Sequence, residues 1–417
     1  MGSVVVVGLG YVGVPLAQLA VARGLAVTGL DTSERIVTSL NSGTSHIDDL
    51  SDADIAEMVA GGFRASTDPA VVATADTVVI CVPTPLDPTG GPDLSMVRSA
   101  ARSIGPHLAS GALVVLESTT YPGTTDEVLR PILEELSGRT VGTDLALAFS
   151  PERVDPGNPK FGIANTPKVV GGITAECARR AEKFYAQLTD QVVVAKGTRE
   201  AEMSKLLENT YRQVNIALVN EMVRFSHELS IDFWDVIRLA QTKPFGFQAF
   251  YPGPGVGGHC IPIDPNYLSH RVEEKLGYPF RFVELAQEIN SGMPRYVAQR
   301  IQTLLNDRAL PVNGSSILLL GVTYKPDISD QRESPAIPLA QVLLGMGARV
   351  SYADPHVSDW AVEGTVRAED PVSAAAEADV TVLLQQHRAF DVAAVTRAAR
   401  CLFDLRGVAT GPRVERL

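Results

Sequence analysis

Short runs of apolar, β-branched residues alternate with amphipathic stretches in the N-terminal part of the chain. The run Val4–Val7 is followed at once by glycines and then by an amphipathic stretch to Arg23, which predicts a strand, a tight turn and a helix. Further strands are predicted at Ala26–Leu30, Thr77–Val82, Leu113–Glu117 and Leu145–Phe149. Strands that alternate with helices in this way predict a parallel sheet covered by helices.

The apolar spacing changes to a helical period between about residues 200 and 240, which predicts a long helix followed by others. The apolar residues of this period are Met203, Leu206, Leu207, Val214, Ala217, Leu218 and Val223. A second alternation of strands and helices begins after Pro311. Its predicted strands are Ile317–Gly321, Arg349–Ala353, Val380–Leu384 and Cys401–Phe403, and its predicted helix is Ala336–Leu344.

These patterns predict an α/β protein in which two Rossmann-like α/β domains are joined by a long central helix and a helical domain. With 417 residues, the chain is long enough for two or three domains with separate cores. We expect the domains to cover residues 1–195, 196–307 and 308–417. Only the change of pattern supports these boundaries, because no repeat or low-complexity linker marks them.

A glycine-rich motif, Gly8-Leu-Gly10-Tyr11-Val12-Gly13, lies between the first predicted strand and the first predicted helix. In that context the motif is typical of a dinucleotide-binding turn. Gly8 allows the turn, Gly10 lets a pyrophosphate approach the backbone, and Gly13 allows the helix to pack closely on the strand. The N-terminus of the helix offers free N–H groups to the phosphates. An ordinary βαβ unit with a glycine-rich turn is the alternative.

The second predicted strand ends at Asp31, which bears on the choice of cofactor. A carboxylate at this place binds the adenosine ribose diol and repels the 2′-phosphate of NADP. Arg35 lies nearby in the sequence and could accept such a phosphate. We predict NAD, with NADP as the alternative.

Polar residues follow three of the predicted strands: Thr84, Thr119 and Glu152. Ligands bind beyond the carboxyl ends of strands in open α/β sheets, so the three together predict one site. Each Thr alone could be a helix cap or a turn former. On the predicted long helix, Lys205 and Asn209 lie one turn apart in a polar stripe, and for Lys205 a solvated surface face is the alternative.

The stretch Phe250–Pro265, FYPGPGVGGHCIPIDP, contains Cys260 shortly after a pair of glycines and four residues before Asp264. Glycine and proline dominate residues 252–257, which predicts a rigid, tightly turned loop. A ligand can reach a thiol on such a loop, whereas the alternative is a buried structural cysteine. For His259 we expect a structural or loop-positioning role, with a Cys-His pair as the alternative, because adjacent side chains usually point apart.

Cations follow the strand ends of the C-terminal α/β unit. Lys325 lies in Thr-Tyr-Lys-Pro-Asp, Arg332 comes shortly after it, and Arg406 lies in Asp-Leu-Arg-Gly. Cations in these places suit a nucleotide diphosphate. Any one of them could instead belong to a surface ion pair.

Composition narrows the class of partner. The net charge of −12 argues against nucleic acid or an anionic membrane as the partner. The four cysteines, Cys81, Cys177, Cys260 and Cys401, are far apart and form no CxxC, so we expect no metal site, no disulfide framework and a cytoplasmic location. We also expect no signal peptide and no membrane-spanning segment.

Over nearly its whole length the sequence resembles the UDP-glucose/GDP-mannose dehydrogenase family, the four-electron nucleotide-sugar 6-dehydrogenases. The motifs that carry the resemblance are GLGYVG, STTYPGTT, SPER, SKLLENTYRQVNIALVNE, GPGVGGHCIPIDP and GVTYKPDISDQRESPA, in this order. The resemblance implies an N-terminal NAD domain, a helical dimerisation domain and a C-terminal nucleotide-binding domain. It therefore implies NAD as cofactor, a UDP-sugar as substrate and a homodimer.

Carried over by position, Cys260 resembles the nucleophile that adds to a C6 aldehyde. Lys205 and Asn209 resemble the groups that polarise the aldehyde oxygen, and Asp264 together with Lys205 is implied to manage the proton of the C6 hydroxyl. These residue types suit the chemistry, because oxidation of an alcohol to an acid needs a covalent handle on the aldehyde. A nearby ammonium also stabilises both a thiolate and an oxyanion.

Other positions match residues that bind water, cofactor and substrate. Glu152 and Thr119 resemble the residues that position the hydrolytic water, Lys325 and Arg406 resemble contacts to the nucleotide sugar, and Arg332 resembles a cofactor contact. The expected cofactor-binding residues are Gly8, Gly10, Tyr11, Val12, Gly13, Asp31, Arg35, Thr84, Thr119 and Arg332. The expected substrate-binding residues are Glu152, Arg153, Lys205, Asn209, Phe250, Tyr251, Gly253, Gly257, Lys325 and Arg406.

One departure from the family pattern bears on the sugar. The glucose branch carries a second glutamate four residues after the one that matches Glu152, and here that position is Pro156. The segments SPERVDPGNP, NTPKVVGG and TKPFGFQAFYPGPG resemble the branch that acts on UDP-N-acetylhexosamines, in which Arg153 lies near the sugar. We therefore predict a 2-acetamido sugar, with UDP-glucose as the alternative, while the epimer stays open. Arg153 could instead cap a helix or pair with Glu152.

Two other classes of function share this fold. A two-electron hydroxyacid dehydrogenase is disfavoured by Cys260 together with Glu152 and by a complete third domain. A non-catalytic binding protein would be expected to lack Cys260 or Lys205, and both are present.

Overall fold

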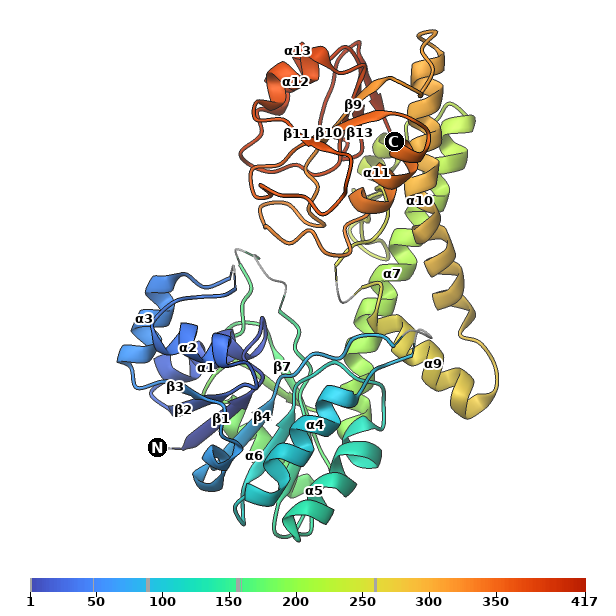
Figure 1. Cartoon of the computed structure of the whole chain (residues 1–417). Coiled ribbons are helices and arrows are strands. Elements are labelled where there is room, and N and C mark those ends of the chain that lie inside the picture. The colour runs from blue at the N-terminus through green and yellow to red at the C-terminus, as the bar shows by residue number, and fades with distance from the viewer. Residues whose placement is uncertain (1, 48, 88–90, 155–157, 159, 259–260) are drawn as a thin grey trace. The chain divides into compact units, whose positions relative to one another are not determined.

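The computed structural model describes residues 2–47, 49–87, 91–154, 158, 160–258 and 261–417. The chain forms two compact units (Figure 1). The first comprises Met1–Glu208 and Asn266–Tyr278, and the second comprises Asn209–Pro265 and Pro279–Leu417. The boundary between them falls inside the long helix α7 (Thr198–Glu228). Each unit is built on one sheet.

The first unit contains an eight-stranded sheet of order β3-β2-β1-β4-β5-β6-β7-β8. Its strands are β1 (Ser3–Val7), β2 (Ala26–Leu30), β3 (Arg64–Ser66), β4 (Thr77–Ile80), β5 (Leu113–Leu116), β6 (Ala146–Phe149), β7 (Lys168–Gly172) and β8 (Val192–Val194). Neighbouring strands pair in parallel except β6 with β7. Val4 and Val6 pack into one apolar cluster, whereas Val5 and Val7 pack into another. The apolar run Val4–Val7 therefore forms a strand because both of its faces are buried.

Helices cover both faces of this sheet (Figure 1). They are α1 (Gly13–Ala22), α2 (Glu34–Asn41), α3 (Asp52–Ala60), α4 (Ser95–Ile104), α5 (Arg130–Ser137) and α6 (Ala175–Tyr185), with the short helical turns η1 (Pro69–Thr74), η2 (Gly105–His107) and η3 (Thr124–Leu129). The strand order reverses direction between β1 and β4. Open α/β sheets bind ligands at such a switch point, beyond the carboxyl ends of the strands.

The second unit contains a six-stranded parallel sheet of order β11-β10-β9-β12-β13-β14. Its strands are β9 (Ser316–Leu320), β10 (Arg349–Ala353), β11 (Val366–Arg367), β12 (Val380–Leu383), β13 (Leu402–Asp404) and β14 (Val414–Arg416), and its helices include α11 (Ala336–Gly345), α12 (Pro371–Glu377) and α13 (Val392–Ala398). Ile317 and Leu319 pack into one core, while Leu318 and Leu320 pack into a second core. This sheet is therefore also buried on both faces.

A helical layer completes the second unit. It contains part of α7, α8 (Phe233–Ala240) and α10 (Arg281–Asn306), while α9 (Asp264–Leu276) begins in the second unit and lies mostly in the first. α7 and α10 run side by side in Figure 1. Buried amides join them, since Asn220 Nδ2 donates to Asn290 Oδ1 at 2.9 Å. Asn220 Oδ1 also accepts from the backbone N–H of Gly253 at 2.9 Å, so this pair anchors the loop that leads to Cys260.

The predicted fold class and strands are confirmed. Observed strand ends differ from the predicted ones by at most two residues, and the ends of β2 and β10 are the same. The predicted helical stretch 200–240 forms two helices, because the chain turns at Ser230, which has φ of +57°, and α8 begins at the N-cap Asp232. The domain boundaries 1–195, 196–307 and 308–417 stay a prediction. No helix within the described part of the chain is long and apolar enough to cross a membrane.

Candidate active site

The glycine-rich turn after β1 has the geometry that its sequence predicts. Gly8 has φ of +93°, a left-handed conformation that favours glycine. A Cβ at Gly13 would lie 1.9 Å from the Gly8 carbonyl oxygen, so only glycine lets α1 approach β1 this closely. A Cβ at Gly10, by contrast, would meet no atom within 4 Å. The turn therefore offers open backbone at Gly10 and the N-terminus of α1, which fits the pyrophosphate of a dinucleotide.

Asp31 lies at the carboxyl end of β2, next to this turn. Its carboxylate accepts the N–H of Leu9 at 2.9 Å and the N–H of Ser33 at 2.9 Å. Arg35 is exposed. Asp31 thus also fixes the glycine-rich turn, a second role that its position in the sequence does not reveal.

The strand-end threonines and Lys205 form one connected group in the first unit. Thr84 Oγ1 donates to the Thr119 carbonyl oxygen at 2.7 Å, and Lys205 Nζ donates to Thr119 Oγ1. Lys205 is only 9% exposed. The alternative of a solvated surface face is therefore wrong for Lys205, whose ammonium is held at the carboxyl end of β5.

A cluster of buried charged side chains contacts Glu152. Lys168 Nζ contacts Glu117 Oε1 and lies 3.1 Å from Glu152 Oε2. The OH of Tyr185 also donates to Glu117 at 2.7 Å. Burial raises the pKa of Glu117 to about 7. Burial also acts to raise the pKa of Glu152, but the Lys168 ammonium and the N–H of Val154 outweigh it and lower that pKa to about 2.

Lys168, Glu117 and Tyr185 were not predicted from the sequence. A glutamate that ends an apolar run and a lysine that begins a strand look like edge residues, although both are buried here. The signal that could have found them is the rule that a buried charge needs a partner. The cluster keeps Glu152 ionised at neutral pH and so able to accept hydrogen bonds from water.

Arg153 pairs with neither Glu152 nor a helix end through its guanidinium. Its NH2 lies 2.7 Å from Glu208 Oε1, its Nε donates to Glu208 Oε2 at 3.2 Å, and its NH1 donates to the Pro167 carbonyl oxygen at 2.8 Å. These contacts use three of the five N–H donors of a guanidinium. The suggested pairing with Glu152 is therefore wrong, and the side chain is 26% exposed.

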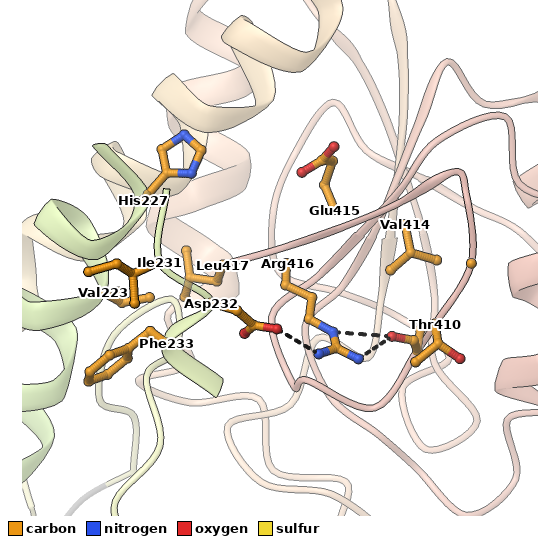
Figure 2. A pocket seen from close by; sticks show the side chains of 12 residues that line it. Val223, His227, Ile231, Asp232, Phe233, Thr410, Val414, Glu415, Arg416 and Leu417 are labelled. Atoms are coloured by element: carbon orange, nitrogen blue, oxygen red, sulfur yellow. Dashed lines mark hydrogen bonds and ion pairs between the residues drawn. The ribbon is translucent and has the colours of Figure 1, made fainter. Parts of the chain in front are cut away.

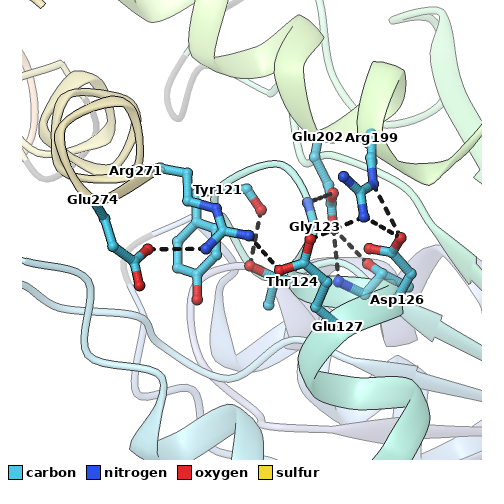
Figure 3. A network of polar contacts seen from close by, with 10 residues as sticks. Tyr121, Gly123, Thr124, Asp126, Glu127, Arg199, Glu202, Arg271 and Glu274 are labelled. Carbon is cyan, nitrogen blue, oxygen red and sulfur yellow. Dashed lines mark hydrogen bonds and ion pairs between the residues drawn. The ribbon is translucent and has the colours of Figure 1, made fainter. Parts of the chain in front are cut away.

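A network of polar contacts ties the segment after Thr119 to α7 and α9 (Figure 3). The carboxylate of Glu202 on α7 is buried and accepts the N–H groups of Gly123 and Thr125 at 2.7 and 2.9 Å. Arg271 on α9 lies over the Tyr121 ring, 4.9 Å from its centroid, and pairs with Glu127. These contacts hold the segment that carries Thr119 against the turn of α7 that carries Lys205.

In the second unit, Asn209 Nδ2 donates to Asp264 Oδ2 at 2.6 Å. Asp264 is 3% exposed, at the start of α9. Cys260 and His259, the predicted nucleophile and its neighbour, lie outside the described residues. The other three cysteines are buried, and burial raises the pKa of the Cys81 and Cys401 thiols.

The loop before Cys260 is held by aromatic and polar contacts. Phe250 packs edge to face on Tyr211, with ring centroids 5.7 Å apart, and the exposed Tyr251 stacks on Trp234 at 6.0 Å. A Cβ built on Gly253 would lie 3.9 Å from the Arg406 guanidinium. The structure therefore brings Gly253 and Arg406 close together, while their contact with a substrate stays a prediction.

Arg406 and Arg332 are in different surroundings. Arg406 Nε donates to the Leu384 carbonyl oxygen, and burial lowers its pKa to about 10, so it stays charged at neutral pH. Arg332 is 55% exposed and forms two contacts of 2.9 Å with Asp330. The predicted cofactor contact of Arg332 stays a prediction. Lys325 lies in a turn after β9 and is half-buried.

Two further features lie apart from the predicted residues. A pocket of about 410 Å³ is lined by side chains such as His227, Asp232 and Arg416, none of them a predicted site residue (Figure 2). Asp327, His356 and His387 have potential ligand atoms within 4.8 Å of one another. Both ring nitrogens of His387 are already in polar contacts, with the N–H of Asp327 and with the Asp354 carboxylate.

Comparison with known families gives three matches in chain order. Residues 2–189 match the NAD binding domain of the UDP-glucose/GDP-mannose dehydrogenase family. Residues 199–292 match its central domain, and residues 318–411 match its UDP binding domain.

Curated relatives and solved structures agree with these matches. The chain is 34% identical to an NDP-N-acetyl-D-galactosaminuronic acid dehydrogenase of Ralstonia nicotianae, over 99% of this chain and 97% of that one. It is 35% identical to a UDP-N-acetyl-D-mannosamine dehydrogenase of Salmonella typhi, over 93% and 94%. A UDP-D-ManNAc dehydrogenase structure from Pyrococcus horikoshii superposes with a TM-score of 0.89 at 30% identity, covering 99% of this chain and 98% of that one.

Proposed function

The chain belongs to the UDP-glucose/GDP-mannose dehydrogenase family of NAD-dependent oxidoreductases, and from this premise we propose that it oxidises C6 of a UDP-N-acetylhexosamine to the carboxylate. UDP-glucose is the alternative substrate. The proposal includes a covalent thiohemiacetal and thioester on Cys260 and the release of a uronic acid by water.

The observation that carries the proposal is the pair of polar residues on α7. Lys205 Nζ contacts Thr119 Oγ1, and Asn209, one helical turn further along, donates to Asp264. Lys205 is buried and Asn209 is half-buried on the same face of the helix, and each is held by a residue of the predicted catalytic set. A charged side chain is seldom buried unless it is paired or serves a site. Lys205 and Asn209 supply an ammonium and an amide to one reacting oxygen.

The residues of this chain fit the steps that the reaction needs. Asp264 and Lys205 together manage the proton of the C6 hydroxyl, the carboxylate as its acceptor and the ammonium as a donor to the developing alkoxide, and NAD, when bound at the glycine-rich turn, accepts hydride in each of the two oxidations. The Cys260 thiolate adds to the aldehyde carbon, which converts a carbonyl into a group that can be oxidised again. Lys205 and Asn209 stabilise the oxyanion. Glu152, kept ionised by Lys168, orients the water that cleaves the thioester.

The contacts of Arg153 favour a 2-acetamido sugar as the substrate. Two of its guanidinium donors are not used by Glu208 or by the Pro167 carbonyl oxygen, and a guanidinium can donate to the carbonyl oxygen of a 2-acetamido group. Glucose has no such acceptor at C2. The relatives named for N-acetylmannosamine and N-acetylgalactosaminuronic acid point to the same class of sugar.

A substrate panel tests the proposal. We expect a higher kcat/KM for at least one of UDP-GlcNAc, UDP-ManNAc and UDP-GalNAc than for UDP-glucose, with two NADH formed per sugar and NAD preferred over NADP. Arg153→Ala should reduce the preference for the acetamido sugar, because one charge-assisted hydrogen bond contributes about 1.5–3 kcal/mol, which is roughly a 10- to 150-fold effect. NADH absorbance at saturating and limiting sugar gives both quantities.

Each outcome of the panel bears on a separate claim. A higher kcat/KM for UDP-glucose contradicts the proposed 2-acetamido sugar but not the four-electron reaction. One NADH per sugar with free aldehyde contradicts the thioester. A preference that survives Arg153→Ala means that the acetamido group is recognised elsewhere, for which the loop Phe245–Tyr251 is the nearest candidate.

We also propose that the protein is a homodimer, on the evidence of one face of α7. Tyr211, Leu218 and Phe225 lie on it at intervals of seven residues, and Leu229 follows four residues later. All four are exposed, Leu229 by 65%. A stripe with this spacing is typical of a helix that packs against another helix. Light scattering on the purified protein should give twice the chain mass of 44.5 kDa, and a single-chain mass would contradict the proposal.

A further inference from the structure

The turn after β9, residues 323–327, contains Tyr324 and Lys325 and is held by the end of the neighbouring strand β12. Gln385 Nε2 donates to the Tyr324 carbonyl oxygen at 2.8 Å. Gln385 is 4% exposed, so this donor is directed at the turn and away from solvent. Thr323 Oγ1 closes the turn from inside by donating to the Lys325 carbonyl oxygen at 2.8 Å. The carbonyl groups of both Tyr324 and Lys325 are therefore fixed by side chains.

His387 and Asp354 hold both ends of the turn. Asp327 has φ of +62°, a left-handed conformation that is unfavourable for a residue other than glycine. Its N–H donates to His387 Nδ1 at 2.9 Å. The ring proton must then be on Nε2, which donates to Asp354 Oδ2 at 3.0 Å. Asp354 Oδ2 also accepts the N–H of Val322 at 2.7 Å, just before the turn begins.

Arg388 adds a third contact to the same place. Its backbone N–H donates to Asp327 Oδ1 at 2.8 Å, and its Nε lies 3.1 Å from Asp327 Oδ2. The Arg388 side chain is 80% exposed. The backbone contact therefore carries more of the restraint, because exposed ion pairs contribute little.

The other face of the turn packs against the glycine pair that precedes Cys260 in the sequence. A Cβ at Gly257 would lie 2.7 Å from Tyr324 Cβ, and a Cβ at Gly258 would lie 2.9 Å from the Tyr324 ring. Any other residue at either position would collide with this tyrosine. The close approach that these glycines allow is therefore an approach of Tyr324. A shift of the turn would move both Lys325 and the backbone two residues before Cys260.

We propose that Gln385, His387 and Asp354 form a clamp that sets the positions of Tyr324 and Lys325 for the reaction. His387 and Gln385 are then positioning residues, which act through Lys325 on the sugar nucleotide and through Tyr324 on the pair Gly257 and Gly258 that precedes Cys260. The proposal rests on the proposed function, because Lys325 is expected there to contact the substrate. It goes beyond that function by assigning a role to a buried histidine that no catalytic step uses.

Two substitutions of His387 distinguish its contact with the Asp327 N–H from its contact with Asp354. In His387→Asn the amide oxygen can take the place of Nδ1 and accept the Asp327 N–H, whereas in His387→Gln the amide nitrogen can replace Nε2 but the Asp327 N–H loses its acceptor. We expect His387→Gln to lower kcat/KM for the UDP-sugar by about 10- to 100-fold, since small misplacements of reacting groups have effects of this size. His387→Asn should retain more activity, and KM for NAD should stay within about twofold in both variants.

Gln385→Leu tests whether the position of Tyr324 affects the surroundings of Cys260, and its readout does not require enzyme activity. We expect the rate of Cys260 alkylation by iodoacetamide, followed by mass spectrometry of the intact protein, to differ from the unmodified protein by about threefold or more, because the thiolate fraction and access of a cysteine depend on its surroundings. Thr381→Val on β12 is the matched control. Thr381 is fully buried, and its Oγ1 has no hydrogen-bond partner among the described residues.

The outcomes separate this inference from the proposed function. If the unmodified protein oxidises none of the UDP-sugars, the proposed function fails, and the alkylation rates alone decide on the clamp. If kcat/KM and the alkylation rate in His387→Gln and Gln385→Leu equal those of Thr381→Val, the clamp is overturned. Equal losses in the two His387 variants, with a changed KM for NAD and a lowered melting temperature, also overturn it, because they indicate a purely structural role.

Discussion

Replacing Cys260 by serine should lower the rate of uronic acid formation by orders of magnitude while NAD binding and folding stay intact. A serine alkoxide is a poorer nucleophile at neutral pH and, once acylated, a poorer leaving group for water to displace. Losses of this size are typical when a covalent nucleophile is removed. The measurement is NADH formation and uronic acid yield under saturating UDP-sugar, with NAD binding followed by fluorescence.

Cys401→Ala is the matched control for this substitution, because Cys401 lies in the same unit and is buried. Burial also raises the pKa of its thiol, so it stays protonated at neutral pH and cannot replace the nucleophile. We expect near-normal turnover in that variant. Near-normal acid formation in Cys260→Ser would instead make Cys260 a structural cysteine and remove the centre of the proposed reaction.

Most of the fold could be predicted from the sequence because both sheets are parallel, apart from the antiparallel pair of β6 and β7, and are buried on both faces. Such strands are continuous apolar runs, of which Val4–Val7 and Ile317–Leu320 are examples, and they stand out from the helices between them. The bounds of α10 were not predicted, although the predicted helical domain 196–307 contains it, and Pro294 lies inside this helix although proline is a signal for a helix end. In the structure, packing of Met293 and Val297 in the core of the second unit outweighs that signal.

Only part of the candidate site could be predicted from the sequence. Residues within a motif, such as Gly8 and Gly13, could be predicted because the local backbone requires glycine at these positions. Lys168 could not be placed, since its role depends on two carboxylates that lie 51 and 16 residues away in the sequence. His387 was missed for the same reason, as its partners Asp327 and Asp354 are 60 and 33 residues away. Polar contacts between residues far apart in the sequence produce no periodic pattern from which they could be predicted.

The buried charge cluster should contribute strongly to stability, and Lys168→Met tests it. Removing the ammonium leaves Glu117, which is buried, and Glu152, whose side chain is 12% exposed, without their cation. Breaking a buried ion pair in this way costs about 3–5 kcal/mol. We expect the free energy of unfolding at pH 8 to fall by about that amount, measured by urea denaturation with circular dichroism. Arg179→Met, which removes an exposed pair with Glu176, should cost less than about 1 kcal/mol.

The pH dependence of this loss has a definite sign. A carboxyl group whose native pKa is raised contributes stability below its unfolded pKa, and this stability disappears as the pH rises through the native pKa. In the unmodified protein Glu117 already has a pKa of about 7, whereas Lys168 helps to lower that of Glu152 to about 2. Without Lys168 both pKa values should rise. The loss should therefore be larger at pH 8, where Glu117 of the variant must carry an unpaired charge or keep a proton that the unfolded chain would release, than at pH 5, where Glu117 is protonated in both folded proteins.

A second substitution locates the effect in the cluster. Glu117→Gln in the Lys168→Met background removes one of the two unpaired charges, so part of the stability at pH 8 should return, and the difference between pH 8 and pH 5 should shrink. The double variant keeps Tyr185 partnered, because the glutamine oxygen can still accept from its OH. A loss of the same size at both pH values would mean that it does not come from the ionisation of Glu117. If Lys168→Met is as stable as Arg179→Met at pH 8, then the cluster contributes no net stabilisation. Lys168 would in that case serve only to keep Glu152 ionised and in place.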